Sequence, residues 1–240
     1  MAANREEFHQ RPTAAADFWP DQPDLLAGRD LQAGGTWMGI TRTGRIAAIT
    51  NYREPLTPQS KIQHSRGHLV RDYLATDISA MEQAERLQGQ GAMYSGYNLL
   101  LGDPNDLVYI SNRNENPLVV SPGTHGLSNH LLDTDWPKVH SGRAHLDSLL
   151  EDGPLESKAL FDLLTDRTLT KGEMPKNIAD SDLPEQLMRH YFIASPDYGT
   201  RCSTVLLLDR EGHVEFLERQ FGPNGLVGET RKFEFDIARS

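Results

Sequence analysis

The sequence is poor in cysteine and in long apolar runs, and these two scarcities exclude whole classes of protein. Cys202 is the only cysteine among 240 residues, which excludes an intramolecular disulfide and a cage of several thiolates around zinc or an iron–sulfur cluster. No apolar run exceeds four residues, whereas a membrane-spanning helix needs about 20. The first residues also lack the apolar core of a secretory signal. These features predict a cytoplasmic protein with no stable membrane insertion.

Positive charge is also in short supply. The chain has 24 basic and 34 acidic residues, which gives a formal net charge of −10. This charge repels phosphate backbones and anionic lipid headgroups, so nucleic acid is not an expected partner. A chain of this length can bury a large core without help from a metal or disulfide. With no internal repeat or flexible linker, residues 1–240 are expected to form a single domain.

Apolar periodicity predicts blocks of strand that alternate with blocks of helix. Segregated blocks of this kind are typical of an α+β fold in which helices cover the faces of antiparallel sheets. The first predicted strand begins at Trp37, and a hairpin turn is expected at Thr43-Gly44. The predicted order is a hairpin over 37–51, helices within 61–90, strands at 94–103, 106–113 and 116–121, helices after Asp135 and through Leu155–Leu164, and strands near 201–209, 213–221 and 231–237.

Polar side chains gather at the ends of the predicted strands. They are Asn51, Arg53, Asn98, Asn112, Arg113, Asn129 and Arg201. Asparagine offers donors and an acceptor, and arginine offers a planar fork for carboxylate or phosphate. Gathered at one rim, such groups would bind an anion or stabilise an oxyanion. The alternative is that asparagine is simply a good turn residue.

Other motifs leave two interpretations open or predict no site. Arg29 and Asp30 precede Gly34-Gly35 and are expected to form an ion pair that holds this loop, which lacks the lysine of a phosphate loop. His64 and His68 have no third ligand at a matching spacing, so no metal site is predicted. Cys202 is either a thiol with a pKa lowered by Arg201 or a small apolar residue that begins a buried strand. The bulky side chains of Trp37 and other aromatic residues fit core packing or the walls of a flat ligand.

Several blocks together resemble one known family. The blocks include NREEFHQRPTAAADFW, AGRDLQAGGTWMGITRTGRIAAITNYREP, YSGYNLLLGD, GTHGLSNHLLDTDWPKV and YGTRCSTVLLLDREGHVEFLERQF. In this order they resemble the transport and Golgi organization protein 2 family, also called the NRDE protein family after its Asn-Arg-Asp-Glu signature. Here the signature reads Asn4-Arg5-Glu6-Glu7, so glutamate stands where the family has aspartate.

The resemblance implies a fold like that of the N-terminal nucleophile hydrolases, an αββα sandwich of two antiparallel sheets between helix layers. Members of the family usually begin with Met-Cys and an apolar strand before the signature. The resemblance therefore implies that this chain is truncated at the N-terminus and that its first strand is missing. Without the N-terminal nucleophile, no catalytic residue is expected in this chain. An unpaired sheet edge would favour a homo-oligomer.

The function that the resemblance implies is the handling of a small amphipathic anion, in haem trafficking or in acyl-coenzyme A and lipid metabolism. Haem would be cargo, and no cofactor is expected. The candidate ligand-binding residues are Asn4, Arg5, Glu6, Glu7, Arg29, Asp30, Trp37, Asn51, Arg53, Asn98, Asn112, Arg113, Asn129 and Arg201.

Two alternatives remain open. The first is a cysteine amidohydrolase that cleaves C–N bonds in the full-length protein. There Arg5 and Glu6 would orient the nucleophile, and Asn98, Asn129 or Arg201 would stabilise the oxyanion. The second alternative is a scaffold without catalytic activity, in which the polar side chains only hold loops in place.

Overall fold

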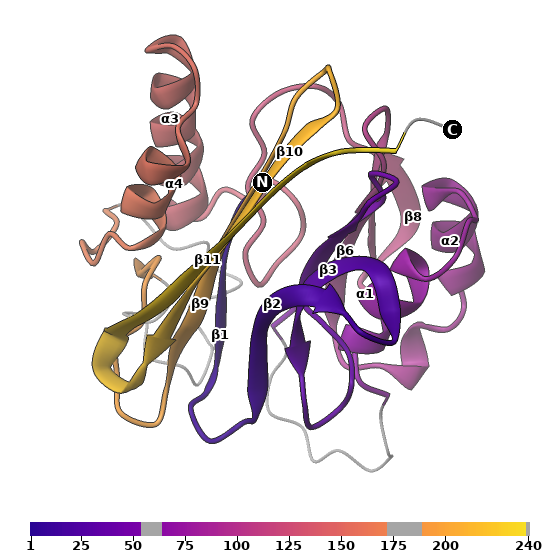
Figure 1. Cartoon of the computed structure of the whole chain (residues 1–240), viewed down its shortest axis with the longest axis horizontal. Helices are drawn as coiled ribbons and strands as arrows, with labels where there is room; N and C mark the ends of the chain where they lie inside the picture. The colour runs from indigo at the N-terminus through magenta and orange to yellow at the C-terminus, as the bar shows by residue number, and fades with distance from the viewer. Residues whose placement is uncertain (54–63, 172–188, 239–240) are drawn as a thin grey trace.

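Two antiparallel sheets pack face to face between two layers of helices. The computed structural model describes residues 1–53, 64–171 and 189–238. One helix layer lies on the left in Figure 1 and the other on the right, with the strands between them. The predicted α+β sandwich is therefore confirmed by the arrangement of the described elements.

The smaller sheet has four strands and the larger sheet has seven, and all neighbours that pair are antiparallel. The four-stranded sheet has the order β1 (Ala2–Phe8), β9 (Tyr198–Leu208), β10 (His213–Gly222) and β11 (Leu226–Asp236). The seven-stranded sheet runs in sequence order through β2 (Thr13–Trp19), β3 (Gln22–Asp30), β4 (Met38–Thr41), β5 (Ile46–Asn51), β6 (Tyr97–Gly102), β7 (Leu107–Ser111) and β8 (Asn114–Val119).

Each sheet has its own pair of helices on its outer face. Helices α1 (Gly67–Leu74) and α2 (Ala80–Leu87) contact the seven-stranded sheet. Helices α3 (Pro137–Glu151) and α4 (Ser157–Leu164) lie together, and α4 contacts β1 and β9 of the four-stranded sheet. Two short 3-10 helices, η1 (Gly91–Met93) and η2 (Pro223–Gly225), complete the described elements.

Three clusters of buried side chains fill the spaces between these four layers. Leu69, Tyr73 and Leu74 of α1 pack with strand residues such as Leu99 on the outer face of the larger sheet. Between the sheets, Leu26 and Ile40 meet Phe216. Leu160 and Phe161 of α4 pack on Val205 and Leu217 of the smaller sheet. Removal of these apolar surfaces from water is the main force that holds the layers together.

Most element predictions agree with the structure, but several boundaries were wrong, and β11 begins at Leu226 rather than near residue 231. Gly44 has a φ of 82° in the β4–β5 turn, a conformation that glycine adopts without steric cost. Strand β8 begins at Asn114, so the chain turns at Asn112-Arg113 and not at residues 114–116. Helix α3 has Trp136 rather than Asp135 as its N-cap, with Pro137 in the first turn.

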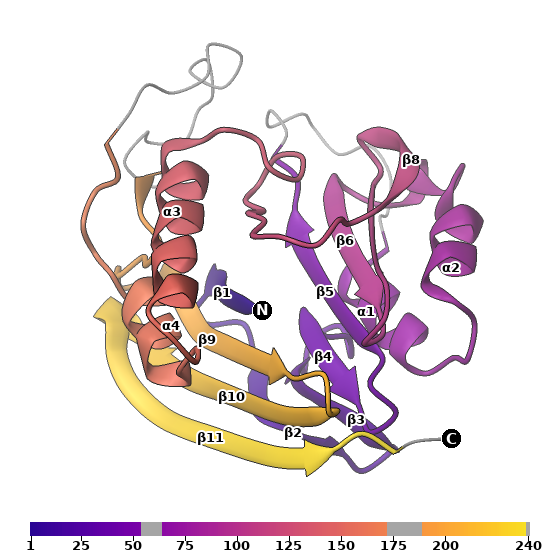
Figure 2. The same ribbon diagram turned by 90° about the horizontal axis from the view of Figure 1, so that it is seen from above.

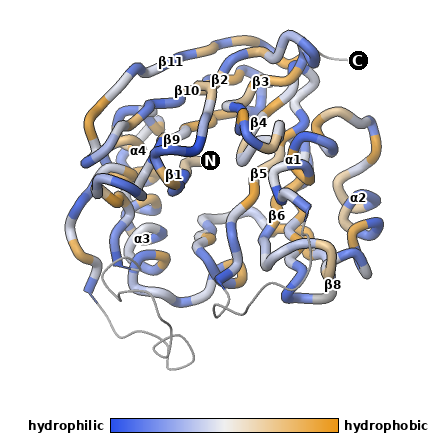
Figure 3. Tube along the Cα trace, turned by 90° about the horizontal axis from the view of Figure 1, so that it is seen from below, coloured by the Kyte–Doolittle hydropathy of each residue, from blue (hydrophilic) through white to orange (hydrophobic). Residues whose placement is uncertain are grey.

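The prediction that the first strand begins at Trp37 was wrong, because the preceding residues form three strands. Strand β1 pairs with β9 along its whole length, from Ala2 opposite Val205 to Phe8 opposite Tyr198. It lies near the middle of the molecule in Figures 2 and 3, where it carries hydrophilic residues. The signature is thus part of a sheet rather than a surface tail.

Candidate functional site

Strand β1 sends the side chains of the signature to two different faces of its sheet. The side-chain amide of Asn4 faces the helix layer, where it donates to the carbonyl oxygens of Leu164 at 2.8 Å and Tyr191 at 2.7 Å. The hydroxyl of Ser203 donates to Asn4 Oδ1 at 2.6 Å. Arg5 points the opposite way, toward the seven-stranded sheet, because successive side chains alternate along a strand. Asn4 therefore docks α4, and Arg5 lies between the sheets.

Arg5 is a partly buried cation with few partners. Its guanidinium lies 4.2 Å from the centroid of the Trp37 ring, and Nη1 donates to Thr13 Oγ1 at 3.3 Å. No carboxylate of the described residues comes within ion-pair distance of it. Burial lowers the pKa of Arg5 from its usual value. The indole N–H of Trp37 is also buried without a hydrogen-bond partner in the part of the chain that the structure describes.

Glu6 and Lys138 form a second charged group on the helix side of β1. Burial raises the pKa of the Glu6 carboxyl, and the nearby charge of Lys138 opposes that change. Burial lowers the pKa of the Lys138 ammonium, with Glu6 opposing the shift and Arg53 adding to it. The Lys138 Nζ lies 5.8 Å from the Trp136 ring centroid, and no ion pair is formed by Lys138 within residues 1–53, 64–171 and 189–238.

A buried thiol, Cys202, and a buried acid, Glu218, lie close to Arg5. Cys202 is opposite Arg5 in the β1–β9 register and is only 1% exposed. Glu218, also 1% exposed, accepts from Ala16 N at 2.7 Å and from Gln220 Nε2 at 2.6 Å. Burial and the neighbouring Glu218 raise the pKa of Cys202 well above its usual value. Burial likewise raises the pKa of Glu218. The interpretation of Cys202 as a thiol with a lowered pKa was wrong, and that of a small buried residue is confirmed.

The remaining charged candidates near β1 hold the turn between β1 and β2. Asp30 forms an ion pair with Arg11, with an Nη2–Oδ2 distance of 2.7 Å. Glu7 lies 3.6 Å from the same arginine. Arg201 Nη1 donates to the carbonyl oxygens of Phe8 at 2.9 Å and Arg11 at 3.0 Å. The predicted Arg29–Asp30 ion pair was wrong, because adjacent strand residues point to opposite faces, and Arg29 pairs with Asp21 instead.

A third group of candidates fastens the loop that follows β8. Asn129, which has a φ of 46°, donates through its side-chain Nδ2 to Asn51 O at 3.2 Å, and its backbone carbonyl oxygen accepts from Arg53 N at 2.8 Å. Asn98 is fully buried, where it donates to His130 O at 2.8 Å and accepts from the Tyr109 hydroxyl at 2.7 Å. The loop thereby covers the ends of β5 and β6. These asparagines hold backbone in place.

Asn112 and Arg113 lie at a different place, in the turn between β7 and β8. Asn112 Nδ2 donates to three carbonyl oxygens around η1, and its Oδ1 accepts from Tyr97 N at 2.8 Å. Arg113 Nη1 donates to Asn112 O at 2.8 Å. The single rim expected from the sequence is therefore divided among β1, the loop after β8, and this turn.

The charged and buried side chains around β1 are called the β1 cluster, which comprises Arg5, Glu6, Lys138, Cys202 and Glu218. Two of them, Lys138 and Glu218, were not predicted from the sequence. Glu218 has the same strand parity as the buried residues Val214 and Phe216, so a charged residue in the inward register was a signal for a buried acid. Lys138 follows Pro137 at the start of a predicted helix, and only the tertiary position of this helix start brings Lys138 near Glu6.

The described part of the chain does not group three or more histidine, cysteine, aspartate or glutamate side chains in a way that could hold a metal ion. None of the helices that the structure describes is long and apolar enough to cross a membrane.

The fold and this cluster define an α+β sandwich with a charged edge strand in its smaller sheet, and comparison with known proteins gives its family. The family model of transport and Golgi organisation 2 matches residues 1–223. The chain belongs to this family. Its relatives include the transport and Golgi organization protein 2 homologs of Bos taurus, 37% identical, and Homo sapiens, 35% identical. Each match covers 99% of this chain and 92% of the relative.

Solved structures give more distant likenesses. The chain is similar to the Caenorhabditis elegans ortholog of N-acylethanolamine-hydrolyzing acid amidase, with a TM-score of 0.48, 14% identity and 85% of each chain covered. It is also similar to penicillin V acylase from Agrobacterium tumefaciens, with a TM-score of 0.41, 13% identity, and coverage of 98% of this chain and 77% of the acylase. Likenesses this distant establish no activity for this chain.

Proposed function

We propose that the chain binds a small amphipathic anion around β1, with Arg5 and Lys138 as its cationic contacts. The observation that carries the proposal is that both cations are partly buried and neither has a carboxylate at ion-pair distance among the described residues. A cation removed from water without a carboxylate in ion-pair contact loses free energy of solvation. The charge of an anionic ligand would compensate for the lost solvation free energy, which would give the site affinity for carboxylate or phosphate.

The other arginines near this cluster already have acceptors. Arg11 is paired with Asp30, and Arg201 donates to two backbone carbonyl oxygens. Because β1 is the edge strand of its sheet, Arg5 and Lys138 approach the same edge from its two faces. A ligand that lies along this edge can contact both cations.

Apolar side chains beside the same strand account for the amphipathic part of the proposal. The Trp37 ring supports the Arg5 guanidinium. Phe8 is 58% exposed and packs edge-to-face on Tyr198, with ring centroids 5.2 Å apart. Leu31, 57% exposed, follows β3 and donates its backbone N–H to Pro12 O in the same turn region. Haem and acyl-coenzyme A both combine anionic groups with apolar surface, so these are the ligands proposed.

Direct titration tests the proposal. Haemin binding is followed by its absorption band, and palmitoyl-coenzyme A binding by calorimetry, with coenzyme A alone and palmitate alone as probes for the two halves. Arg5→Gln and Lys138→Gln are each expected to weaken binding at least tenfold, since a hydrogen bond to a charged group contributes about 1.5–3 kcal/mol. Arg210→Gln and Lys171→Gln, which change exposed cations away from β1, are the matched controls and should stay within twofold.

Binding that is unchanged in both β1 variants would overturn the proposed site. Failure of both haemin and palmitoyl-coenzyme A to bind would overturn the proposed ligand class and favour the scaffold. A cysteine hydrolase acting on C–N bonds is the other alternative. In that alternative the nucleophile is an N-terminal cysteine of the full-length protein, a role that the buried Cys202 with its raised pKa does not fill.

A further inference from the structure

Strand β11 is an edge of the four-stranded sheet, and no strand in the described part of the chain pairs with its outer side. It follows the outer border of the molecule in Figure 2, with β10 beside it. The strand is 11 residues long and contains no proline. An edge strand presents unpaired backbone N–H and C=O groups, to which another strand can add. This edge is therefore open to strand addition.

The other three sheet edges carry features that oppose such pairing. Strand β1 has a register shift between Arg5 and Glu6, and β2 has two shifts against β3. Strand β8 contains Pro117, which has no N–H to donate. In contrast, the pairing of β11 with β10 runs without a shift from Thr230 to Asp236. Because bulges and prolines are common protections of an edge, β11 is the described edge best suited to receive a strand.

Alternate residues of β11 direct their backbone groups outward. Ile237 N, just beyond the strand, donates to Gly212 O at 2.9 Å on the β10 side, whereas Ala238 N faces the other way and donates to Arg42 O at 2.8 Å. Hydrogen-bonding direction alternates along an antiparallel strand. The outward backbone groups are therefore those of Thr230, Lys232, Glu234 and Asp236.

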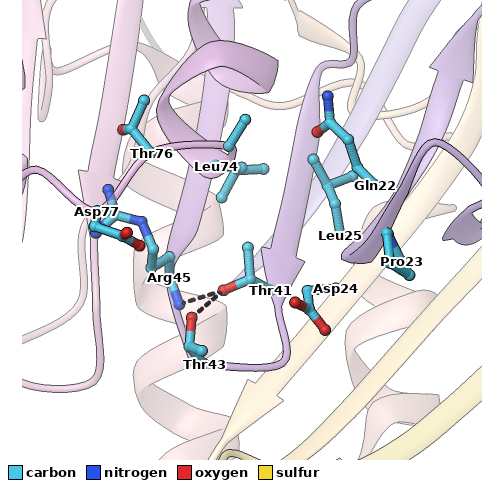
Figure 4. A pocket seen from close by; sticks show the side chains of 11 residues that line it. Gln22, Pro23, Asp24, Leu25, Thr41, Thr43, Arg45, Leu74, Thr76 and Asp77 are labelled. Carbon is cyan, nitrogen blue, oxygen red and sulfur yellow. Dashed lines mark hydrogen bonds between the residues drawn. The ribbon is translucent and has the colours of Figure 1, made fainter.

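Contacts on the inner face and at the C-terminal end hold β11 in place. Phe233 packs against Phe18 of the larger sheet, with ring centroids 5.9 Å apart. The β4–β5 hairpin, which accepts the hydrogen bond from the end of the strand, is itself braced by bonds from Thr41 to Thr43 and Arg45 (Figure 4). A strand that is already ordered loses little conformational entropy when a partner adds to it.

We propose that β11 pairs with β11 of a second copy of this chain, antiparallel, across a twofold axis at Phe233. In this register Lys232 of one copy lies opposite Glu234 of the other, and the pair occurs twice because the interface is symmetric. Both residues belong to the outward set, so each pair also exchanges backbone hydrogen bonds. Opposite charges that face each other across two strands stabilise their pairing.

Charge complementarity selects this register. Backbone direction allows only axes that place outward residues opposite outward residues. Among axes between residues 231 and 235, those at Arg231, Lys232 and Glu234 each place that residue opposite itself. An axis at Phe235 places Glu234 opposite Asp236. Like charges directly opposite each other destabilise a pair, and only the axis at Phe233 has none.

The charges near the axis are already arranged in alternation within one chain. Lys232 Nζ lies 2.9 Å from Glu234 Oε1 and 3.5 Å from Glu215 Oε2. An isolated lysine on an edge discourages pairing. Here Glu234, two residues further on, gives the second copy a counter-charge, so pairing would join two ion pairs into a square of four alternating charges.

Sedimentation velocity of the full chain tests this dimer. Edge-to-edge pairing gives a small interface, and small interfaces are weak, so the expected dissociation constant is about 10–100 µM. Measurements at concentrations on both sides of this range should show a reversible monomer–dimer equilibrium. Arg5→Gln should dimerise like the wild type, which separates this edge from the β1 site.

Two charge reversals test the register. Lys232→Glu alone and Glu234→Lys alone each create two like-charge pairs across the axis, and each is expected to weaken dimerisation at least tenfold. An equimolar mixture of the two variants, and the double variant, restore opposite charges and should dimerise within about threefold of the wild type. Lys171→Glu and Glu151→Lys reverse exposed charges elsewhere and are the matched controls, which should stay within twofold.

Amide hydrogen exchange reports the backbone pairing. The amides of Thr230, Lys232, Glu234 and Asp236 should exchange more slowly at high protein concentration than at low concentration, because dimerisation gives them acceptors. The amide of Phe233, which faces β10, should change little.

A chain that stays monomeric at about 500 µM would overturn the dimer and leave this edge to a strand of a different protein. Dimerisation that is unchanged in both charge reversals would overturn β11 as the interface. Dimerisation that both reversals weaken but their mixture does not restore would overturn the register.

Discussion

The side-chain amide of Asn4 lies 2.8 Å from the carbonyl oxygen of Leu164, the last residue of α4. The last carbonyl groups of a helix have no partner within the helix, so a side chain from another element can satisfy one of them. The first residue of the signature thus joins the edge strand of the smaller sheet to the helix that covers it. Its position 160 residues from Leu164 in the sequence makes this a tertiary contact.

Replacement of Asn4 by alanine is expected to lower the free energy of unfolding by about 2–4 kcal/mol. The substitution leaves two carbonyl oxygens and the Ser203 hydroxyl without their partner, and each such loss costs about 1–3 kcal/mol when the group cannot reach water. Urea denaturation measures the change. Asn105→Ala, in an exposed turn, is the control and should shift the midpoint little. An Asn4 variant as stable as the wild type would show that α4 docks without this contact.

Gly28→Ala is expected to displace the Trp37 ring. A Cβ at position 28 would meet Trp37 Cζ2 at 2.3 Å, which is far inside van der Waals contact. Overpacking of this kind costs about 1–3 kcal/mol, and it would remove the support beneath Arg5. Near-ultraviolet circular dichroism and thermal unfolding report the two effects. Gly142→Ala, where the nearest atom is at 3.5 Å, should leave both signals close to wild type.

The His125–Asp133 pair should make stability depend on pH. His125 Nδ1 lies 2.7 Å from Asp133 Oδ2, and Nε2 lies 2.8 Å from Ser121 O. The hydrogen bond to Asp133 raises the pKa of His125, and burial is the main effect that opposes this rise. For Asp133, bonds from Gly126 N and His125 outweigh burial and lower the pKa.

The direction of the pH dependence of stability follows from the raised pKa of His125 and the lowered pKa of Asp133. Stabilisation by His125 is complete below its unfolded pKa of about 6.5 and is lost as pH rises through the higher folded value. Stabilisation by Asp133 is present above about pH 3.9 and is lost as pH falls through its lower folded value. His125→Gln should therefore cost about 1 kcal/mol near pH 5.5 and less near pH 8.5, measured by urea denaturation. An equal cost at both values would contradict a charged His125.

Cys202 should be unreactive in the folded protein. Its side chain is buried and its pKa is raised, so little thiolate exists and reagents have no access to it. A colorimetric thiol reagent at pH 8 is expected to detect almost no thiol in the native chain and one thiol per chain in denaturant. Rapid native reaction would mean that β9 opens locally, and hydrogen exchange of its amides would then be fast as well.

Sequence patterns predicted the elements whose side chains alternate or recur with clear periods. The helical spacing of Leu69, Tyr73 and Leu74 predicted α1, and the alternation in β10 predicted a half-buried strand. The same rules failed for β1 because its central residues are all polar. Polar side chains on both faces of a strand are rare unless partners from two other layers receive them, and those partners come from distant parts of the chain.

The candidate site, like the strands and helices, was predicted only in part from the sequence. The sequence predicted that Asn4, Arg5 and Glu6 were important through a family resemblance, but nothing local indicated that Asn4 would hold a helix while Arg5 would stack on Trp37. Lys138 was not among the candidates, although it is, like Arg5, a partly buried cation near β1 whose pKa is lowered by burial.

The sequence by itself determined the α+β class, the position of most helices and strands and the family, because periodicity and motif order are local properties of the chain. Only the tertiary structure decided which polar residues remain without counter-charges. Burial and partner choice depend on segments that lie far apart in the sequence and meet only when the sheets pack. Arg201 and Arg5 have the same side chain, yet backbone carbonyl oxygens receive Arg201 while an aromatic ring receives Arg5.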